Sequence, residues 1–196
     1  MRKFLTGKRL QKIMRAAGAR QFSLSIVLEN IYDSHNVSAI IRSCDAVGIP
    51  KVNLLYTIES FPKLNRISSA SANKWVQIEK FKSVDECVGS LKKDGFRIYS
   101  SILDQNVKSL YELDLTKKVA IVVGNENRGV SDEMKKQSDE TFYIPMKGMI
   151  QSLNVSVAAA VSLFEALRQR ENKNMYDKSD LTQDQLNLLI DNWCRK

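Results

Sequence analysis

Cysteine and histidine are scarce in this chain of 196 residues, which has three cysteines and one histidine. Cys44, Cys87 and Cys194 are far apart in the sequence, and no C-x-x-C pair is present. Because zinc sites and disulfide frameworks both need grouped cysteines or histidines, we expect neither of them, and no metal. Cys44 falls on the apolar side of a predicted helix, so burial is its simplest explanation.

Long hydrophobic runs are also missing. No stretch approaches the roughly 20 apolar residues that a membrane-spanning helix needs. The basic N-terminus lacks the apolar run of a secretory signal, although a mitochondrial transit peptide remains an alternative. We therefore expect a cytoplasmic protein without a membrane partner.

Glycine-rich binding loops are a third absence. The chain has eight glycines, and none of them forms a G-x-G pair. This excludes the dinucleotide fingerprint, the P-loop and the glycine-rich loop of Rossmann-type methyltransferases, and a G-x-S-x-G nucleophile elbow is missing too. The commonest ligand sites of α/β proteins are thereby excluded.

Acidic residues are absent from the first 28 positions, although the chain as a whole carries a net charge of +8. Residues 165–196 hold equal numbers of acidic and basic side chains, so the excess of positive charge is concentrated in the N-terminal segment. Solvated surfaces usually mix both signs, which favours contact with a polyanion such as RNA over a merely solvated face. The basic side chains of this segment are Arg2, Lys3, Lys8, Arg9, Lys12, Arg15 and Arg20. Of these, we take Arg9, Lys12 and Arg20 as candidate RNA contacts.

Strand patterns alternate with helical patterns along most of the chain. Short apolar runs predict strands at 23–30, 52–56, 76–81, 96–103, 119–124 and 142–146. Helical periodicity predicts helices at 7–20, 34–47, 83–94, 131–137 and 154–171, a short one near 67–72 and a last one in the tail. This alternation is typical of an α/β fold with a mostly parallel sheet and helices on both faces. We expect an RNA-binding helix at 1–21, an α/β domain at 22–171 and a helical extension at 172–196.

A first polar cluster, NIYDSHNVSAIIR, spans Asn30 to Arg42 at a strand-to-helix transition. Asn36 stands at the start of the predicted helix, where asparagine often caps free N–H groups. Arg42 lies away from the apolar stripe of that helix. Helix capping and a solvated surface are the structural alternatives to a functional role for these two residues.

A second cluster, GNENRGVS, follows the most apolar predicted strand at residues 124–131. Ligands of open α/β sheets bind beyond the carboxyl ends of the strands. Gly124 and Gly129 permit a sharp turn or a close approach to a ligand, and Glu126 lies between them. The structural alternative is an ordinary loop in which Ser131 caps the next helix.

A third cluster, IPMKGMIQSLNVSVAAA, spans residues 144–160. Its loop contains Met146, Met149, Ile150 and Leu153, which is unusually apolar for a surface connection. Such a loop must cover the protein body, a partner chain or a ligand, and its backbone groups could bind an adenine edge. Ser152 or Asn154 is expected to cap the following helix.

These three clusters, in this order, resemble the signature motifs of the SpoU/TrmH family of RNA ribose 2′-O-methyltransferases. The first motif is matched by Asn30, Asn36 and Arg42, the second by Gly124, Glu126, Gly129 and Val130, and the third by IPM-x-G-x-x-x-SLNVS-x-A. The basic N-terminus, Arg168 and Arg170, and the chain length are most similar to the branch that methylates a D-loop guanosine of tRNA. Two alternatives stay open: the same reaction on rRNA, and a non-catalytic RNA-binding protein on this scaffold.

The resemblance implies a trefoil-knotted α/β fold and a homodimer whose active site draws on both chains. It also implies S-adenosylmethionine (AdoMet) as the cofactor, with Arg42 acting as the proton acceptor or as a cation that stabilises the alkoxide. His35 is a minor rival as the base, and a contact with RNA is its more ordinary role. The supporting site residues are Asn36, Glu126, Ser152 and Asn154; the cofactor residues are Ser101, Gly124, Asn125, Gly129, Ile144, Met146 and Leu153; and the RNA contacts include His35, Arg168 and Arg170.

Overall fold

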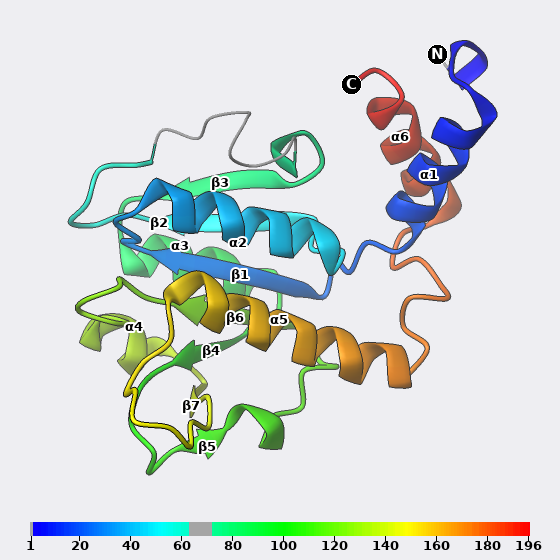
Figure 1. Cartoon of the computed structure of the whole chain (residues 1–196). Helices are drawn as coiled ribbons and strands as arrows, with labels where there is room; N and C mark the ends of the chain where they lie inside the picture. The colour runs from blue at the N-terminus through cyan, green and yellow to red at the C-terminus, as the bar shows by residue number, and fades with distance from the viewer. Residues whose placement is uncertain (1, 63–71) are drawn as a thin grey trace.

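The protein is built on one central β-sheet of seven strands, all paired in parallel (Figure 1). This is a computed structural model, and it describes residues 2–62 and 72–196. The strand order is β3-β2-β1-β6-β4-β7-β5. The strands are β1 Leu24–Glu29, β2 Lys51–Leu55, β3 Gln77–Phe81, β4 Arg97–Ser101, β5 Lys108–Ser109, β6 Val119–Val123 and β7 Glu140–Tyr143. The predicted mostly parallel sheet is confirmed.

Six α-helices accompany the described strands. They are α1 Gly7–Gly18, α2 Ser34–Ala46, α3 Val84–Lys93, α4 Asp132–Gln137, α5 Val155–Asn172 and α6 Gln183–Trp193, with 3₁₀ turns at Arg2–Phe4, Ala72–Lys74 and Leu110–Glu112. The predicted elements are confirmed with shifts at their ends, except that the helix expected near 67–72 lies mostly outside the described residues. Strand β7 ends before Pro145, whose nitrogen has no hydrogen to donate to a neighbouring strand. Strand β5 was not predicted, because two residues carry no periodicity.

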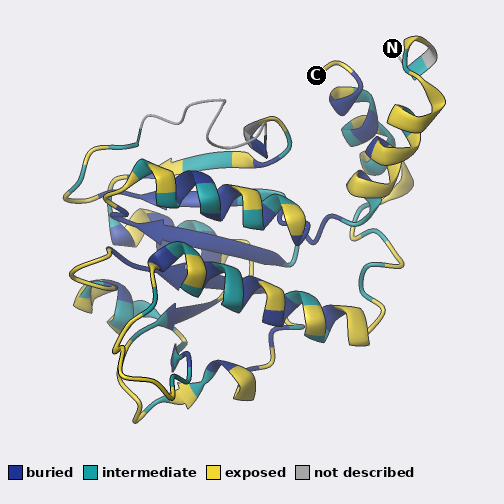
Figure 2. Cartoon of the chain, viewed as in Figure 1, coloured by how far each residue is buried: buried dark blue, intermediate teal, exposed yellow. Residues whose placement is uncertain are grey.

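Helices cover both faces of the sheet, as expected. Along β1, Leu24, Ile26 and Leu28 join the core under α2 and α5, whereas Val27 joins a second core under α3 and α4. This alternation follows from the two-residue period of a strand. The central strands β1 and β6 are buried along their whole length (Figure 2), as the continuous apolar run of residues 119–124 requires.

Local signals fix the ends of α2. Asp33, rather than Asn36, caps the helix, because its carboxylate accepts a hydrogen bond from the backbone N–H of His35 at 2.8 Å. The capping alternative for Asn36 is therefore wrong, and its side chain is free for another task. Gly48 ends the helix with a φ of 84°, and a Cβ atom there would lie 2.7 Å from the backbone oxygen of Ala19.

The first and last helices form one unit, which the sequence did not predict. Helices α1 and α6 pack together beyond the end of the sheet where β1 begins (Figure 1). Their shared core contains Ile13, Ala17, Ile190, Trp193 and Cys194. The basic N-terminal helix is therefore held by the C-terminal helix.

Arg20 connects this two-helix unit to the sheet domain, which corrects its expected role in RNA binding. The residue is only 2% exposed, and its side chain donates to the backbone oxygen of Ile49 at 2.9 Å and to the carboxylate of Asp45. Its guanidinium also lies 4.9 Å from the ring centre of Trp193. Because its donors face the protein interior, Arg20 cannot reach a phosphate.

Arg170 is a second correction, since this expected RNA contact is fully buried near the end of α5. Its guanidinium donates to the backbone oxygens of Leu115, Ser23 and Lys117 at 3.0, 2.9 and 2.7 Å, and to the side chains of Gln21 and Ser23. Burial lowers its pKa. Arg170 thus binds the ends of the segments that lead into β1 and β6. Arg168 is exposed and paired with Glu165, so it stays a candidate for RNA contact.

Two kinds of feature were searched for among the described residues: membrane-spanning helices and clusters of metal ligands. No helix among them is long and apolar enough to cross a membrane, and no group of three or more acidic, cysteine or histidine side chains is placed to hold an ion. Cys44, Cys87 and Cys194 are all buried without a disulfide partner, which confirms the expected burial of Cys44.

We predict that Arg170→Met lowers the free energy of unfolding by about 3 kcal/mol or more, because several buried carbonyl oxygens lose their donors. Urea denaturation followed by circular dichroism measures this change. Arg168→Met, two positions away on the exposed side of α5, is the matched control and should cost much less. Equal losses in the two variants would show that Arg170 does not hold these segments together.

Candidate active site

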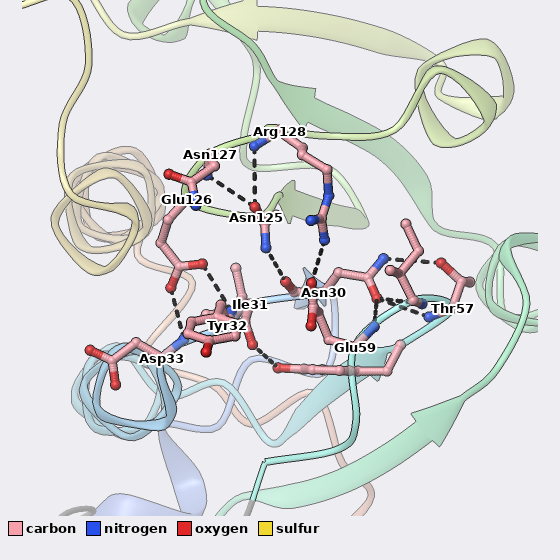
Figure 3. Close-up of polar contacts among 12 residues, drawn as sticks. Asn30, Ile31, Tyr32, Asp33, Thr57, Glu59, Asn125, Glu126, Asn127 and Arg128 are labelled. Carbon is pink, nitrogen blue, oxygen red and sulfur yellow. Dashed lines mark hydrogen bonds and ion pairs between the residues drawn. The ribbon is translucent and has the colours of Figure 1, made fainter.

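The polar clusters meet where β1 and β6 end, side by side in the middle of the sheet. The chain runs outward from β1 to β2 and β3 on one side, and β4 and β7 lie on the other side of β6. This is the switch point at which open α/β sheets bind ligands. Asn30 follows β1, and Asn125 and Glu126 follow β6, so the first two motifs meet here (Figure 3).

Asn30 ties the end of β1 to the loop after β2. Its backbone has a φ of 51°, in the left-handed region that asparagine tolerates better than most residues. Its side-chain oxygen accepts hydrogen bonds from the backbone N–H groups of Thr57, Ile58 and Glu59 at 3.0, 3.0 and 3.2 Å (Figure 3). Asn30 is only 4% exposed, so it shapes the site and does not meet a substrate.

Asn125 folds the second motif into a tight loop. Its side-chain oxygen accepts from the backbone N–H groups of Asn127 and Arg128, and its Nδ2 donates to the backbone oxygen of Asn30 at 2.7 Å. The motif-two loop is thereby fastened to the end of β1. The guanidinium of Arg128 reaches the carboxylate of Glu59 at 2.6 Å, which adds a further link to the loop after β2 (Figure 3).

The two glycines of this motif serve the turn itself. A Cβ atom on Gly124 would lie 2.2 Å from the backbone carbon of Gly129, so no side chain fits there. Gly129 has a φ of 68° and pairs with Asn125 through two backbone hydrogen bonds. The loop closes on its own backbone, and this explains both glycines without any ligand.

The carboxylate of Glu126 caps this arrangement. It accepts hydrogen bonds from the backbone N–H of Tyr32 at 2.9 Å, from that of Asp33 at 3.2 Å and from Nδ2 of Asn36 at 2.9 Å. Partial burial raises the pKa of Glu126, but these hydrogen bonds lower it by more, so the net pKa lies below its usual value. The side chain is therefore a carboxylate whose oxygens are already engaged.

Asn154 brings the third motif into the cluster. It caps α5 by accepting from the backbone N–H of Ser156 at 2.8 Å, as expected. Its Nδ2 donates to Oδ1 of Asn36 at 3.2 Å, which completes a chain of hydrogen bonds from Glu126 through Asn36 to Asn154. Ser152 is exposed, and no described residue hydrogen-bonds to it. The structure thus brings one residue of each motif into contact and leaves Ser152 beside them.

Arg42 does not touch this cluster. It is exposed on α2, and within the described part of the chain nothing pairs with its guanidinium. Six residues separate it from Asn36, which is a rise of about 9 Å along the helix. Arg42 also lies about 120° from Asn36 around the helix axis, so it is placed on a neighbouring side of α2. His35, also exposed, lies two turns before Arg42 on the same side of α2.

A cavity of about 480 Å³ lies beyond the ends of β4 and β7. It is lined by Ile102, Leu103, Gln105, Tyr143, Ile144, Met146, Gly148, Met149, Ile150 and Gln151. Of the expected cofactor residues, Ile144 and Met146 line the cavity. Ser101 does not line it, but it is the neighbour in sequence of the lining residue Ile102. Leu153 packs against the core instead, and Gly124, Asn125 and Gly129 lie outside its lining. The lining residues that follow β4, which are Ile102, Leu103 and Gln105, were not predicted from the sequence. Their position just after the carboxyl end of a predicted strand could have indicated them.

The features of this cavity fit a nucleoside cofactor. Its volume is within the roughly 300–1,000 Å³ of small-molecule sites. Within the described residues, the backbone of 145–153 makes no hydrogen bond, so its N–H and C=O groups are free to bind an adenine edge. Met149 is 99% exposed and Ile150 62% exposed. Leu153 covers the protein body, one of the three surfaces expected for this loop, whereas Met149 and Ile150 remain for a ligand or a partner chain.

Comparison with known proteins agrees with this geometry. Residues 23–164 match the model of the SpoU rRNA Methylase family. The chain belongs to this family. It is 39% identical over 189 residues to the tRNA (guanosine(18)-2'-O)-methyltransferase of Thermus thermophilus, covering 96% of this chain and 95% of that protein.

Solved structures give the same assignment. The A. aeolicus TrmH/SpoU tRNA modifying enzyme matches with a TM-score of 0.89 and 37% identity, over 96% of this chain and 95% of that one. AviRb from Streptomyces viridochromogenes, solved with AdoMet, matches with a TM-score of 0.68 over 79% of this chain and 62% of its own; at 24% identity it supports the fold alone. The chain shares the trefoil-knotted α/β fold of the TrmH/SpoU enzymes, and its family is AdoMet-dependent.

We predict that the stabilising effect of Glu126 depends on pH. Because its folded pKa is depressed, this contribution is complete above the unfolded pKa of about 4.3 and is lost as the pH falls through the lower folded value. Glu126→Gln should therefore be less stable than the wild type at pH 6, and the difference should shrink below about pH 4. Urea denaturation at several pH values measures it. Glu171→Gln is the control, and an equal pH dependence in both variants would contradict the prediction.

Proposed function

We propose that this protein transfers the methyl group of AdoMet to the ribose 2′-hydroxyl of a tRNA guanosine in the D-loop, the position numbered 18 in its relatives' names. The observation that carries this proposal is the hydrogen-bonded chain of Glu126, Asn36 and Asn154, which joins all three motifs at one end of the sheet. Similarity over 95% of the length of a tRNA enzyme favours tRNA over the rRNA alternative.

The chemistry requires positioning and the removal of one proton. A ribose hydroxyl is a weak nucleophile until its proton leaves, whereas AdoMet supplies a methyl group that is already activated on a sulfonium. Glu126 is a poor choice as the base, because its pKa is lowered and its oxygens accept three hydrogen bonds. Its role is to hold Asn36 and the start of α2 in place.

We propose that Arg42 is the residue that acts on the ribose 2′-hydroxyl. Its unpaired, exposed guanidinium can stabilise the developing alkoxide as a fixed cation, or receive the proton with help from an RNA phosphate. The residues of the cavity after β4 and β7, including Ile144 and Met146, would hold the cofactor. No step needs a metal ion.

The experiment that tests the function uses purified protein, methyl-labelled AdoMet and EDTA. Transcripts of tRNA should gain label, and nuclease digestion should place it as 2′-O-methylguanosine in the D-loop. Label on rRNA but not on tRNA would establish the first alternative. RNA binding without transfer to either would establish the non-catalytic alternative.

We predict that Arg42→Ala lowers the single-turnover methylation rate about 100- to 1,000-fold at saturating tRNA and AdoMet, as expected for loss of one electrostatic or acid–base group. Arg42→Lys should also fail, because a flexible point charge does not replace a planar fork. His35→Ala is the matched control on the same side of α2 and should lose much less. A larger loss in His35→Ala would make histidine the base.

A homodimer is the second part of our proposal. The inner side of α5 packs on the sheet, yet its outer side is also apolar at three positions with helical spacing: Val157, Ala160 and Phe164. Val157 is 47% exposed and Phe164 is 50% exposed. A helix that is apolar on both sides needs a second partner, and another copy of the chain supplies one.

We predict that Phe164→Glu dissociates this dimer, since a charge in an apolar interface loses its hydration without gaining a partner. Light scattering at micromolar concentration should give the dimer mass for the wild type and the monomer mass for the variant. Leu188→Glu, at a residue 63% exposed on α6, is the control and should keep the dimer. A monomeric wild type would remove the proposal.

RNA binding by α1 is the third part. Arg9, Lys12 and Arg15 are exposed on this helix, whereas Arg20 is excluded by its burial. We predict that replacing these three with alanine weakens tRNA binding and reduces the log–log salt slope by about 0.9 for each lost phosphate contact. AdoMet affinity should stay unchanged, because α1 lies beyond the opposite end of the sheet (Figure 1). Replacing Lys135 and Lys136 of α4 with alanine is the control and should change tRNA affinity less. Unaltered tRNA affinity in the α1 variant would show that α1 is a solvated basic helix that does not contact RNA.

A further inference from the structure

A large aromatic side chain stands exposed beside the Glu126 cluster. Tyr32 is 76% exposed, more than any other tyrosine that the structure describes. Exposed aromatic groups next to a polar site are characteristic of surfaces that bind a partner. The mechanism above uses only the backbone of this residue.

The backbone that carries Tyr32 is held on every side. Its own N–H and that of Asp33 donate to the carboxylate of Glu126. The preceding carbonyl, of Ile31, accepts a hydrogen bond from the hydroxyl of buried Tyr56 at 2.9 Å (Figure 3). The exposed ring therefore projects from a fixed turn, whereas its hydroxyl has no hydrogen-bond partner among the described residues.

One cation on the helix that follows this turn is unpaired among the described residues. The nearby carboxylates are engaged within the protein: Asp33 caps α2, Glu126 accepts three hydrogen bonds, and Glu59 is paired with Arg128. Arg42, farther along α2, has no such pairing in the described part of the chain. This cation can therefore pair with a phosphate of a polyanionic partner.

We propose that the ring of Tyr32 stacks on a nucleobase of the RNA, at or next to the nucleotide whose ribose is methylated. This inference rests on the function proposed above. The proposed target lies in a loop of the tRNA, where bases can be unstacked, and proteins hold unstacked bases on aromatic side chains. Tyr32 is thus a positioning residue, and the Glu126 carboxylate that orders the active site also orients this platform.

The test compares Tyr32→Ala and Tyr32→Phe with the wild type and with Tyr111→Ala, which removes a tyrosine 56% exposed in the turn after β5. Loss of one stacked base corresponds to a rise in the KM for tRNA of about 5- to 150-fold in Tyr32→Ala. Tyr32→Phe keeps the ring and should stay near the wild type, as should Tyr111→Ala. AdoMet affinity, melting temperature and the oligomeric state in solution should be the same in all four proteins.

A second measurement identifies the stacked base. Transcripts that lack one base, at the target guanosine or at either neighbour, are methylated by the wild type and by Tyr32→Ala. At the stacked position, the two losses should not add, because both remove the same contact.

Each outcome separates the two proposals. Additive losses at all three positions, an unchanged KM in Tyr32→Ala, or an equal defect in Tyr32→Phe would overturn stacking while tRNA methylation stands. A changed oligomeric state of Tyr32→Ala in solution would instead assign the ring to the contact between chains. A wild-type protein that methylates no tRNA would remove both proposals.

Discussion

The carboxylate of Glu126 is the contact on which the arrangement of the active site depends. It accepts from two backbone N–H groups at the start of α2 and from the side chain of Asn36, and Asn36 in turn accepts from Asn154 at the start of α5. Segments separated by about ninety residues or more along the chain are joined by this short series of hydrogen bonds. A carboxylate suits this position, because it offers several acceptor sites and its negative charge is favoured beside the N-terminus of a helix.

The glycines and asparagines around this carboxylate are explained by the same geometry. Gly124 must lack a side chain because the loop returns against it, and Asn30 adopts a left-handed backbone that lets its side chain collect three N–H groups. Much of the family motif is thus needed to place Glu126 and α2. The residues left exposed after this structural work, Arg42, His35, Ser152 and Tyr32, are the ones available to a substrate.

The two ends of the sheet have different tasks. At the carboxyl ends of the strands, loops carry polar groups that remain open to ligands. Near the other end, Arg170 donates buried hydrogen bonds to the segments that precede β1 and β6. Arg20 connects the unit formed by α1 and α6 to the sheet domain. The basic helix is therefore rigidly attached but lies away from the Glu126 cluster of its own chain. A large RNA that contacts both ends, or both copies in a dimer, is consistent with this separation.

The sequence by itself determined the α/β class, nearly all of the strands and helices, and the three motifs that meet at the active site. These follow from hydrophobic periodicity and from residues whose chemistry is local, such as Gly48 or the cap at Asn154. Only the tertiary structure decided which basic residues face solvent: Arg9 and Lys12 do, whereas Arg20 and Arg170 are buried. It alone gave Asn36 its partners, paired α1 with α6 and placed the cavity after β4 and β7. The physical reason is that a charge or an amide looks the same in any sequence, and its role is fixed by the hydrogen-bond partners that distant segments bring to it.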